Sequence, residues 1–392
     1  MKPKLVRITT VPQSLKTLLK GQLNFMSNNG FDIVGVSSSG QTLMDVKQQE
    51  GVDVFNVEMS RKITPLKDLV ALWKLYRFFR HFKPLIVHTH TPKAGTIGMI
   101  AAKIAGVQIR LHTVAGLPLL EVNGFKRRIL NIVEKITYAC ATKVYPNSLG
   151  LRRIIEKCGF CSSQKLKVIA NGSSNGINTE YFDPNLFSND PDLKEKLGIK
   201  SNNFVFIFVG RLVGDKGINE LVKAFDIFQI NHQNCNLLLV GDYETHLDPL
   251  KEETLKILET NENIISVGFQ SDVRPFFAIS DCLVFPSYRE GFPNVVMQAG
   301  AMGLPCIVTN INGCNEIIHD GINGYIIPVK NIRAIIDKMC ETFVNKLIYK
   351  KLQKKAREMI TSRYEQKVVW EAIKSEYNDF LRLSNKSNYS SI

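Results

Sequence analysis

The chain has 392 residues, of which 44% are hydrophobic, and its 50 Lys and Arg against 36 Asp and Glu give a formal net charge of +14. This length exceeds one ordinary hydrophobic core and indicates two domains of roughly 150–200 residues each. Pro and Gly are not enriched, and no run of 18 apolar residues occurs, so we expect neither a low-complexity chain nor a membrane-spanning helix.

Short apolar segments alternate with helical patterns in both halves of the chain. The predicted strands of the first half are 5–10, 32–37, 53–57, 85–89, 109–113, 143–146 and 166–170, with helices at 66–82 and 93–105. The second half repeats the scheme with strands at 204–209, 236–240, 264–267, 283–286 and 306–308, and helices at 218–229, 250–259 and 294–302. After Arg333 the pattern is almost entirely helical. Repeated β-α-β alternation predicts an α/β fold with two doubly wound parallel sheets.

The best linker is the segment 182–191, which contains Asp-Pro, Asn-Asp and Pro. We therefore expect an N-terminal domain at 1–185, a C-terminal domain at 192–365, and a last helix within 366–392 that returns to the first domain. Ligands of such sheets bind beyond the carboxyl ends of the strands, so the predicted site is the cleft between the two domains.

The positive charge is concentrated in the first half. Residues 1–190 contain 26 Lys and Arg against 12 Asp and Glu, whereas residues 191–392 contain 24 of each. This asymmetry predicts an anionic partner for the first domain. The segment 69–83 interleaves aromatic side chains with five basic residues and no acidic one, which suits a helix lying on an anionic membrane surface. The alternative is an ordinary helix with one face in the core.

The first candidate site follows the apolar strand 204–209. Gly210 ends this strand, a loop carries Arg211 and Lys216, and a helix begins near Ile218. Two cations near a helix N-terminus form an anion site, and the planar Arg fork together with the Lys point charge suits a diphosphate. The alternative is a solvated basic turn.

The second candidate site follows the strand 283–286. A loop presents Glu290, Gly291 permits close approach of a ligand to the backbone, and Pro293 suits the first turn of a helix that carries Gln298. A carboxylate beside free N–H groups can bind the hydroxyls of a sugar while the N–H groups face its phosphates.

The two motifs, Gly210-Arg-Leu to Lys216-Gly217 and Glu290-Gly-Phe-Pro to Gln298-Ala, resemble those of the retaining glycosyltransferases of family 4. Fragments at 238–242, 267–272, 280–287 and 310–324 agree in order, so the resemblance covers nearly all of 165–330; the first half matches more loosely, at 87–90, 111–118 and 171–177. The sequence is most similar to bacterial capsule and O-antigen enzymes that extend undecaprenyl-diphosphate-linked sugars, such as the bacillosamine-linked N-acetylgalactosaminyltransferases. The resemblance implies the GT-B architecture, with two facing Rossmann-like domains and an interdomain cleft.

The resemblance also implies roles for these residues. Arg211 and Lys216 would hold the donor diphosphate and stabilise the leaving nucleotide without a metal, and Glu290 would contact the hydroxyls of the donor sugar. Gln298 replaces a Glu that usually binds the ribose, which predicts a weaker ribose contact rather than inactivity. The full set expected to bind the donor is Gly210, Arg211, Lys216, Phe269, Glu290, Gly291, Phe292, Pro293, Asn294 and Gln298.

The first domain departs from the family pattern. Ala115 stands where relatives often carry a His that touches the donor sugar, so His112 and Glu121 become the candidate catalytic residues there. A His at a strand end is more often a hydrogen-bonded structural residue, and this alternative applies to His88, His90 and His112. Cys158 and Cys161 form a CxxC without a second ligand pair, so no metal site is expected.

The implied function is retaining transfer of an N-acetylhexosamine or related hexose from a UDP-sugar to a lipid-linked saccharide, in synthesis of capsule, O-antigen or exopolysaccharide. The expected location is cytoplasmic, peripheral at the inner face of the plasma membrane, with no cofactor and no nucleic acid. Two alternatives stay open: a sugar-nucleotide epimerase of similar two-domain fold, and a non-catalytic protein whose basic half binds an anionic surface or nucleic acid.

Overall fold

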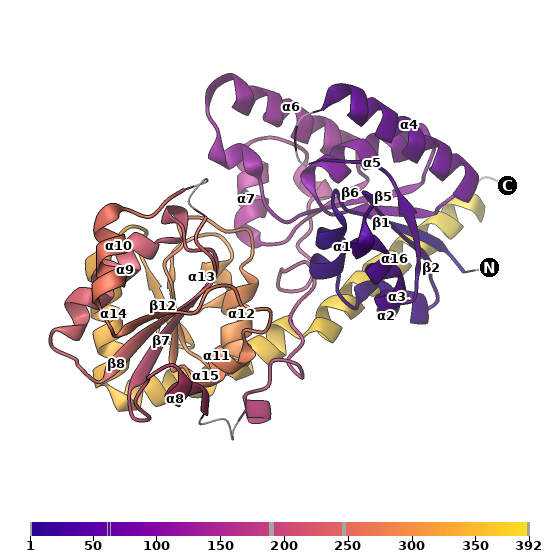
Figure 1. Cartoon of the computed structure of the whole chain (residues 1–392). Helices are drawn as coiled ribbons and strands as arrows, with labels where there is room; N and C mark the ends of the chain where they lie inside the picture. The colour runs from indigo at the N-terminus through magenta and orange to yellow at the C-terminus, as the bar shows by residue number, and fades with distance from the viewer. Residues whose placement is uncertain (1, 61, 63, 188–191, 245–247, 390–392) are drawn as a thin grey trace. The chain divides into compact units, whose positions relative to one another are not determined.

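The computed structural model describes residues 2–60, 62, 64–187, 192–244 and 248–389, except for the side chains of 120, 121 and 384–389. The chain forms two compact units (Figure 1). Unit 1 comprises Met1–Gly176 together with Gln366–Ile392, and unit 2 comprises Ile177–Glu365. The chain therefore changes unit at Gly176, ahead of the segment 182–191 expected as the linker, of which residues 188–191 lie outside the described residues.

Unit 1 contains a parallel six-stranded sheet in the order β3-β2-β1-β4-β5-β6. Its strands are β1 (Lys4–Ile8), β2 (Asp32–Ser37), β3 (Asp53–Asn56), β4 (Ile86–Thr89), β5 (Ile109–Val114) and β6 (Lys143–Pro146). Its helices are α1 (Pro12–Leu18), α2 (Gln22–Asn28), α3 (Gln41–Glu50), α4 (Pro65–Phe82), α5 (Pro92–Ile104), α6 (Gly124–Cys140), α7 (Leu149–Lys157) and α16 (Gln366–Tyr389). These six strands coincide with predicted ones to within two residues at each end.

The strand predicted at 166–170 is wrong. Leu166 makes only an isolated bridge to Val144 of β6, and Ala170 has a φ of 50°. This left-handed conformation is incompatible with a strand, so the chain leaves the sheet instead of extending it.

Helices cover both faces of this sheet with two hydrophobic cores. One core contains buried side chains of α4, α5, α6 and α7, and the other contains those of α1, α2, α3 and α16. Gly95 and Gly98 let α5 lie close to the sheet. A Cβ at Gly95 would lie 2.4 Å from Cε1 of His112, and one at Gly98 would lie 2.7 Å from Cγ2 of Thr89.

A buried polar network joins α16 to the sheet of unit 1. The fully buried Arg7 of β1 donates from Nη1 to the hydroxyl of Tyr377 (2.9 Å), from Nε to Nε2 of His90 (3.0 Å), and from Nη2 to Gln22. His88 shares hydrogen bonds with the hydroxyls of Tyr377 (2.6 Å) and Thr113 (2.7 Å). The last helix therefore completes the interior of a sheet built from the first residues of the chain.

Unit 2 contains a second parallel sheet in the order β12-β11-β10-β7-β8-β9. Its strands are β7 (Phe204–Val209), β8 (Cys235–Val240), β9 (Ile264–Ser266), β10 (Cys282–Phe285), β11 (Cys306–Thr309) and β12 (Gly324–Ile327). Its helices are α8 (Asp192–Lys196), α9 (Ile218–Gln229), α10 (Glu252–Thr260), α11 (Arg274–Ala278), α12 (Asn294–Ala301), α13 (Cys314–Ile317), α14 (Ile332–Val344) and α15 (Lys346–Tyr364). The prediction of an α/β fold with two parallel sheets is confirmed; β12 was not predicted.

The helix that carries Gln298 is held closely against the C-terminal part of unit 2. α12 packs on α15, where a Cβ at Gly300 would lie 2.6 Å from Cγ1 of Ile360. This contact holds α12 in position, and the loop that carries Glu290 leads directly into the first turn of this helix.

Candidate active site

The candidate residues of unit 2 lie at the carboxyl ends of three adjacent strands. Arg211 and Lys216 follow β7, Glu290 follows β10, and Glu244 follows β8, and in the sheet β7 lies between β10 and β8. Loops at this edge are where doubly wound sheets bind their ligands. The two motifs found in the sequence therefore belong to one place in the fold.

Lys216 and Glu290 are joined directly. The Lys216 Nζ lies 2.5 Å from Oε1 of Glu290, and their side chains are 15% and 18% exposed. The hydroxyl of Ser287 donates to the same Oε1 at 3.2 Å. The carboxylate thus has two partners and a fixed direction, although enough of its surface is open to meet a ligand.

Arg211 has a looser partner. Its Nη1 lies 2.8 Å from Oε2 of Glu244, with the two side chains 46% and 37% exposed. Exposed ion pairs of this kind contribute about 0–1 kcal/mol. A phosphate can therefore replace Glu244 beside the guanidinium at little cost.

The loop after β7 is locked against the end of β10. Gly217 has a φ of 73°, and a Cβ there would lie 2.2 Å from the carbonyl oxygen of Pro286. Asp215 reinforces the contact, because its carbonyl accepts from the backbone N–H of Tyr288 (2.9 Å) and its carboxylate pairs with Arg289 (2.8 Å). These contacts set the position of Lys216 relative to Glu290.

The turn between Glu290 and α12 is supported from below. Asn312 donates from Nδ2 to the carbonyl oxygens of Gly291 (2.5 Å) and Glu290 (3.2 Å), and Gly313 leaves room for this loop. Asn294 begins α12 and is exposed, and Gln298 lies partly exposed one turn later.

Among the remaining candidate residues, some are exposed enough to contact a ligand and others are buried in the packing of unit 2. The side chain of Phe269 is 70% exposed, and its backbone N–H donates to Oδ1 of Asp242 at 3.0 Å. Phe292 and Pro293 are buried, so only their backbone can face a ligand. Gly210 has a φ of 150° and lies against Gly241. A Cβ on Gly241 would lie 1.8 Å from the carbonyl oxygen of Gly210. The sequence analysis assigned no role to Glu244, Ser287 or Asn312, although Ser287 and Asn312 lie within the recognised fragments 280–287 and 310–324 and Glu244 follows the fragment 238–242.

This arrangement can bind a sugar linked to a diphosphate. Two cations and the N-terminus of α12 supply positive charge and N–H donors at one edge of the sheet, which suits an anion. Glu290 supplies acceptors for hydroxyl groups beside that anion site.

The two candidate residues of unit 1, His112 and Glu121, are not brought together by a described contact. His112 is buried on β5, its Nδ1 lies 2.8 Å from the hydroxyl of Thr89, and burial lowers its pKa to about 4. Its imidazole is therefore neutral at ordinary pH. Glu121 belongs to the short 3₁₀ turn Pro118–Glu121, and its side chain lies outside the described residues. Within the described part of the chain, no three His, Cys, Asp or Glu side chains are grouped to hold a metal ion.

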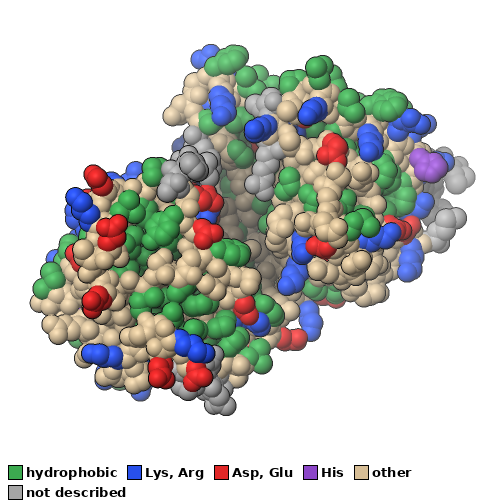
Figure 2. All heavy atoms as spheres, viewed as in Figure 1, with side chains coloured by type: hydrophobic (Ala, Val, Ile, Leu, Met, Phe, Trp, Pro, Cys, Tyr) green, Lys and Arg blue, Asp and Glu red, His purple; other side chains and the backbone are tan. Residues whose placement is uncertain are grey.

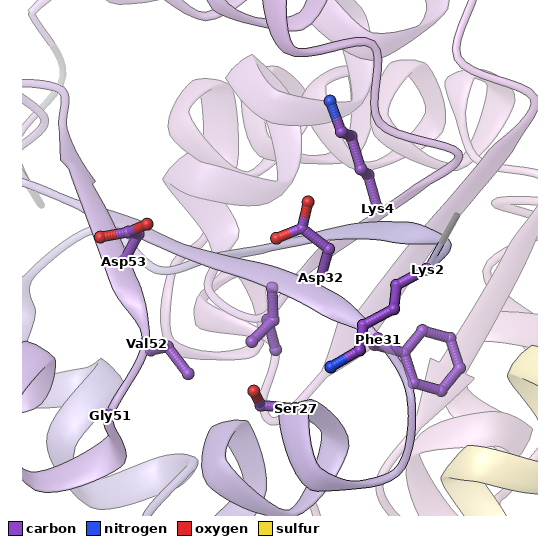
Figure 3. A pocket seen from close by; sticks show the side chains of 9 residues that line it. Lys2, Lys4, Ser27, Phe31, Asp32, Gly51, Val52 and Asp53 are labelled. Atoms are coloured by element: carbon purple, nitrogen blue, oxygen red, sulfur yellow. The ribbon is translucent and has the colours of Figure 1, made fainter.

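A pocket lies at the amino edge of the unit 1 sheet, where the strands begin (Figure 3). It has a volume of about 360 Å³, and its wall includes Lys2, Asp32 and Asp53, near the starts of β1, β2 and β3. Amino edges of doubly wound sheets are not where such folds bind their substrates, so this pocket is not the candidate site.

Two family profiles match the chain. The profile described as "Glycosyl transferases group 1" matches residues 189–359, and the one described as "Glycosyl transferase 4-like domain" matches residues 28–172. The first therefore covers the candidate site of unit 2, and the second covers most of unit 1.

Similar proteins extend over almost the whole chain. A Staphylococcus aureus protein named "Capsular polysaccharide biosynthesis glycosyltransferase CapM" is 35% identical over 97% of this chain and 98% of its own. The Escherichia coli "UDP-Gal:alpha-D-GlcNAc-diphosphoundecaprenol alpha-1,3-galactosyltransferase" is 31% identical over 83% of this chain and 84% of its own. The crystal structure of a glycosyltransferase from Rickettsia africae ESF-5 superposes with a TM-score of 0.79 at 21% identity, over 97% of this chain and 99% of that one.

Proposed function

Because this chain belongs to the group 1 glycosyltransferases, we propose that it transfers a hexose or N-acetylhexosamine from a UDP-sugar to an undecaprenyl-diphosphate-linked saccharide, in synthesis of a surface polysaccharide. The resemblance to family 4 enzymes is confirmed, as is the expected α/β fold class of GT-B enzymes, with one Rossmann-like parallel sheet in each unit. The match to transferases over nearly the full length argues against the epimerase and against a non-catalytic binding protein.

The observation that carries this proposal is the grouping of Arg211, Lys216 and Glu290 at one edge of the unit 2 sheet. In the proposed complex, Arg211 and Lys216 bind the diphosphate of the donor and Glu290 binds hydroxyls of its sugar. Gln298, on the helix that follows, binds the ribose through neutral hydrogen bonds.

The proposed reaction retains the configuration at the anomeric carbon. The bond from C1 of the sugar to the β-phosphate oxygen of UDP breaks, and the acceptor oxygen bonds to C1 on the same face. The acceptor hydroxyl gives its proton to the departing phosphate. Arg211 and Lys216 stabilise the negative charge that grows on the diphosphate, which is electrostatic catalysis by fixed cations.

A lipid-linked acceptor is supported by the surface of unit 1. Hydrophobic residues of α6 form an exposed stripe at helical spacing, whereas the opposite face of the helix is buried; the stripe consists of Phe125, Ile129, Ile132 and Ile136. α4 exposes Leu66, Leu69, Val70 and Trp73 on the same face of the sheet, with α5 between the two helices. Figure 2 shows hydrophobic side chains (green) interspersed with Lys and Arg (blue) along the top of unit 1, where Figure 1 places α6 and α4.

We propose that this surface lies on an anionic membrane. Exposed Lys and Arg accompany both helices, among them Lys67, Arg77, Arg128 and Lys135, and the Arg77 guanidinium lies 4.8 Å from the Trp73 ring. Apolar groups rimmed by cations bind the boundary between lipid headgroups and acyl chains. An apolar groove of about 540 Å³ beside α4, lined in part by Met59, Leu66 and Val70, suits an isoprenoid segment of the acceptor. No described helix is both long and apolar enough to cross a bilayer.

A thermal-shift screen against UDP, GDP, ADP and their common sugar derivatives tests the donor proposal. UDP compounds at 100 times their Kd should stabilise the protein by about 2.7 kcal/mol. Arg211→Ala and Lys216→Ala should remove most of this shift. Lys223→Ala, which removes the α9 partner of an exposed ion pair with Glu253 of α10, should keep it. Stable protein that responds to no nucleotide, or variants that respond like the wild type, would contradict the proposed donor site.

Vesicle co-sedimentation tests the membrane proposal. The protein should bind vesicles containing phosphatidylglycerol more tightly than pure phosphatidylcholine, and added salt should weaken binding. The double variant Ile129→Ser/Ile132→Ser should bind roughly tenfold more weakly. Leu347→Ser, which changes a 76% exposed residue of unit 2, is the matched control and should bind normally. Equal binding of the double variant and the control would refute this surface.

A further inference from the structure

Unit 1 contains a small cavity that the donor site does not use. It has a volume of about 70 Å³ and lies at the carboxyl ends of β4 and β5, where its wall includes His90, His112, Ala115, Gly116 and Glu134. Liquid water occupies about 30 Å³ per molecule, so the cavity has room for roughly two waters and not for a sugar ring. It can therefore hold one small substituent of a larger ligand.

His90 presents a hydrogen-bond donor without a partner. It is 3% exposed and lines the cavity, and its Nε2 accepts from Nε of Arg7 at 3.0 Å. Because Arg7 can only donate, the neutral imidazole must carry its proton on Nδ1. That Nδ1 is buried and has no hydrogen-bond partner within the described part of the chain. A buried donor left unpaired costs about 1–3 kcal/mol, which a ligand atom can recover.

Glu134 presents the complementary acceptor. It lies on α6 and is 8% exposed, although the helix turns its opposite face to solvent. Its side chain forms part of the same wall as His90 and His112. Burial raises the pKa of Glu134, and an interaction with the Tyr138 hydroxyl opposes this shift only in part. A carboxyl group has further lone pairs, so it can accept from a ligand as well.

A neutral imidazole N–H beside a carboxyl group matches a hydroxyl group, which accepts one hydrogen bond and donates another. We propose that this cavity is a subsite for one hydroxyl of the acceptor sugar: Nδ1 of His90 donates to the hydroxyl oxygen, and the hydroxyl donates to Glu134. His112 and Ala115 shape the wall and exclude larger substituents. This inference rests on the proposed function, because it names where that acceptor is recognised.

The cavity has a definite source of rigidity. His112 packs on Gly95 and shares a hydrogen bond with the Thr89 hydroxyl, and His90 accepts a hydrogen bond from Arg7. Groups fixed in this way discriminate strongly against a ligand that lacks the matching hydroxyl, because their own hydrogen bonds are then left unmade.

The test compares full-length wild type and Glu134→Gln with single-deoxy acceptors. The probes are farnesyl-diphosphate-linked N-acetylglucosamine and its deoxy derivatives, each lacking one sugar hydroxyl. With the wild type, removal of the recognised hydroxyl should lower kcat/KM by about 10²-fold, because Nδ1 of His90 and the Glu134 carboxyl are then left without their hydrogen-bond partner. In Glu134→Gln this penalty should shrink to about tenfold, since an amide accepts more weakly.

Two further variants control the experiment. Glu376→Gln changes a carboxyl of unit 1 that is equally buried but bonded to Tyr145 and Lys167, and it should keep the full penalty. His90→Ala should also reduce the penalty, and tryptophan fluorescence shows whether it folds. UDP affinity should be the same in all of these proteins.

Equal deoxy penalties in the wild type and Glu134→Gln for every acceptor would overturn the subsite. A wild-type enzyme that binds UDP but transfers sugar to none of the lipid-linked acceptors would instead contradict the proposed function. In that case, saturation-transfer NMR with methyl N-acetylglucosaminide and its deoxy derivatives decides the subsite: binding that depends on one hydroxyl and on Glu134 supports it, and binding independent of both refutes it.

Discussion

Lys216 and Glu290 occupy each other in the unliganded protein, with 2.5 Å between the ammonium nitrogen and the carboxylate oxygen. Each is assigned a different part of the donor, Lys216 the diphosphate and Glu290 the sugar. In the proposed binding mode, this pair would hold both side chains at the junction between sugar and phosphate before the donor arrives. A donor must share these groups rather than order them, which reduces the entropy lost on binding.

Glu290→Gln should lower kcat/KM for transfer by about 10²-fold, because the variant keeps the shape of the side chain but loses the charge-assisted hydrogen bonds to the sugar. Its affinity for UDP alone should change by less than about threefold, since UDP lacks the sugar that is transferred. UDP release measured at steady state, with isothermal titration of UDP, checks both statements. Normal turnover by Glu290→Gln would show that the carboxylate does not act on the donor sugar.

Gln298→Glu should retain transfer activity and bind UDP several-fold more tightly, because a carboxylate makes stronger hydrogen bonds to the ribose hydroxyls than an amide does. The residue lies partly exposed on α12, so the change should cost little stability. Titration of UDP and of 2′-deoxy-UDP measures the effect. Loss of activity in this variant would mean that Gln298 does not contact the ribose.

Gly217→Ala should damage the donor site more than Gly303→Ala does. Both glycines have positive φ angles, 73° and 85°, but a Cβ at Gly217 meets the Pro286 carbonyl at 2.2 Å whereas one at Gly303 meets nothing within 4 Å. Gly303→Ala should cost only the backbone strain of about 1 kcal/mol. Gly217→Ala should in addition displace Lys216 and weaken UDP binding by at least tenfold. Equal UDP affinities in the two variants would contradict the coupling between these loops.

Unit 1 should lose stability as the pH falls below about 6.5. Burial lowers the pKa values of His88, His90 and His112, that of His112 to about 4. Between the unfolded value near 6.5 and the folded value, the unfolded chain binds more protons, so the free energy of unfolding decreases with falling pH by up to about 1.4 kcal/mol per pH unit for each histidine.

Both tryptophans, Trp73 and Trp370, lie in unit 1, so urea denaturation followed by their fluorescence reports this unit. His112→Gln should flatten the dependence on pH between 6.5 and 4 by the contribution of one histidine. An unchanged slope would mean that His112 titrates normally in the folded protein.

The parallel sheets were predictable because their strands are short apolar runs bounded by glycine, proline and polar residues, as at Phe204–Val209. The two errors have different causes, one in the local backbone and one in a tertiary contact. The segment 166–170 has the composition of a strand, but the left-handed Ala170 turns it away from the sheet. β12 begins at Gly324, and a glycine in a sequence usually indicates a turn. Here glycine is required by a neighbouring strand, because a Cβ at Gly324 would lie 2.1 Å from the carbonyl oxygen of Cys306.

The residues proposed to bind the donor could be named from the sequence, but their contacts with one another could not. Arg211, Lys216 and Glu290 stand in recognisable motifs, whereas the pairing of Arg211 with Glu244 depends on how the loop after β8 folds. The cavity in unit 1 shows the same limit. Glu134 is one acidic residue in an amphipathic helix, and only the packing of α6 shows that it faces inward.

Unit 2 is inserted between the two segments of unit 1, and this determines the order in which the two units can fold during synthesis. Unit 2 is one continuous segment and can fold as soon as residue 365 has emerged, but until α16 is made, Arg7 and His88 lack the hydroxyl of Tyr377 inside their sheet. Premature termination anywhere before Tyr377 therefore leaves the interior of unit 1 incomplete, and Arg7 lacks one of its hydrogen-bond partners. Only a chain that includes α16 can complete unit 1, and the instability of shorter products exposes them to proteases.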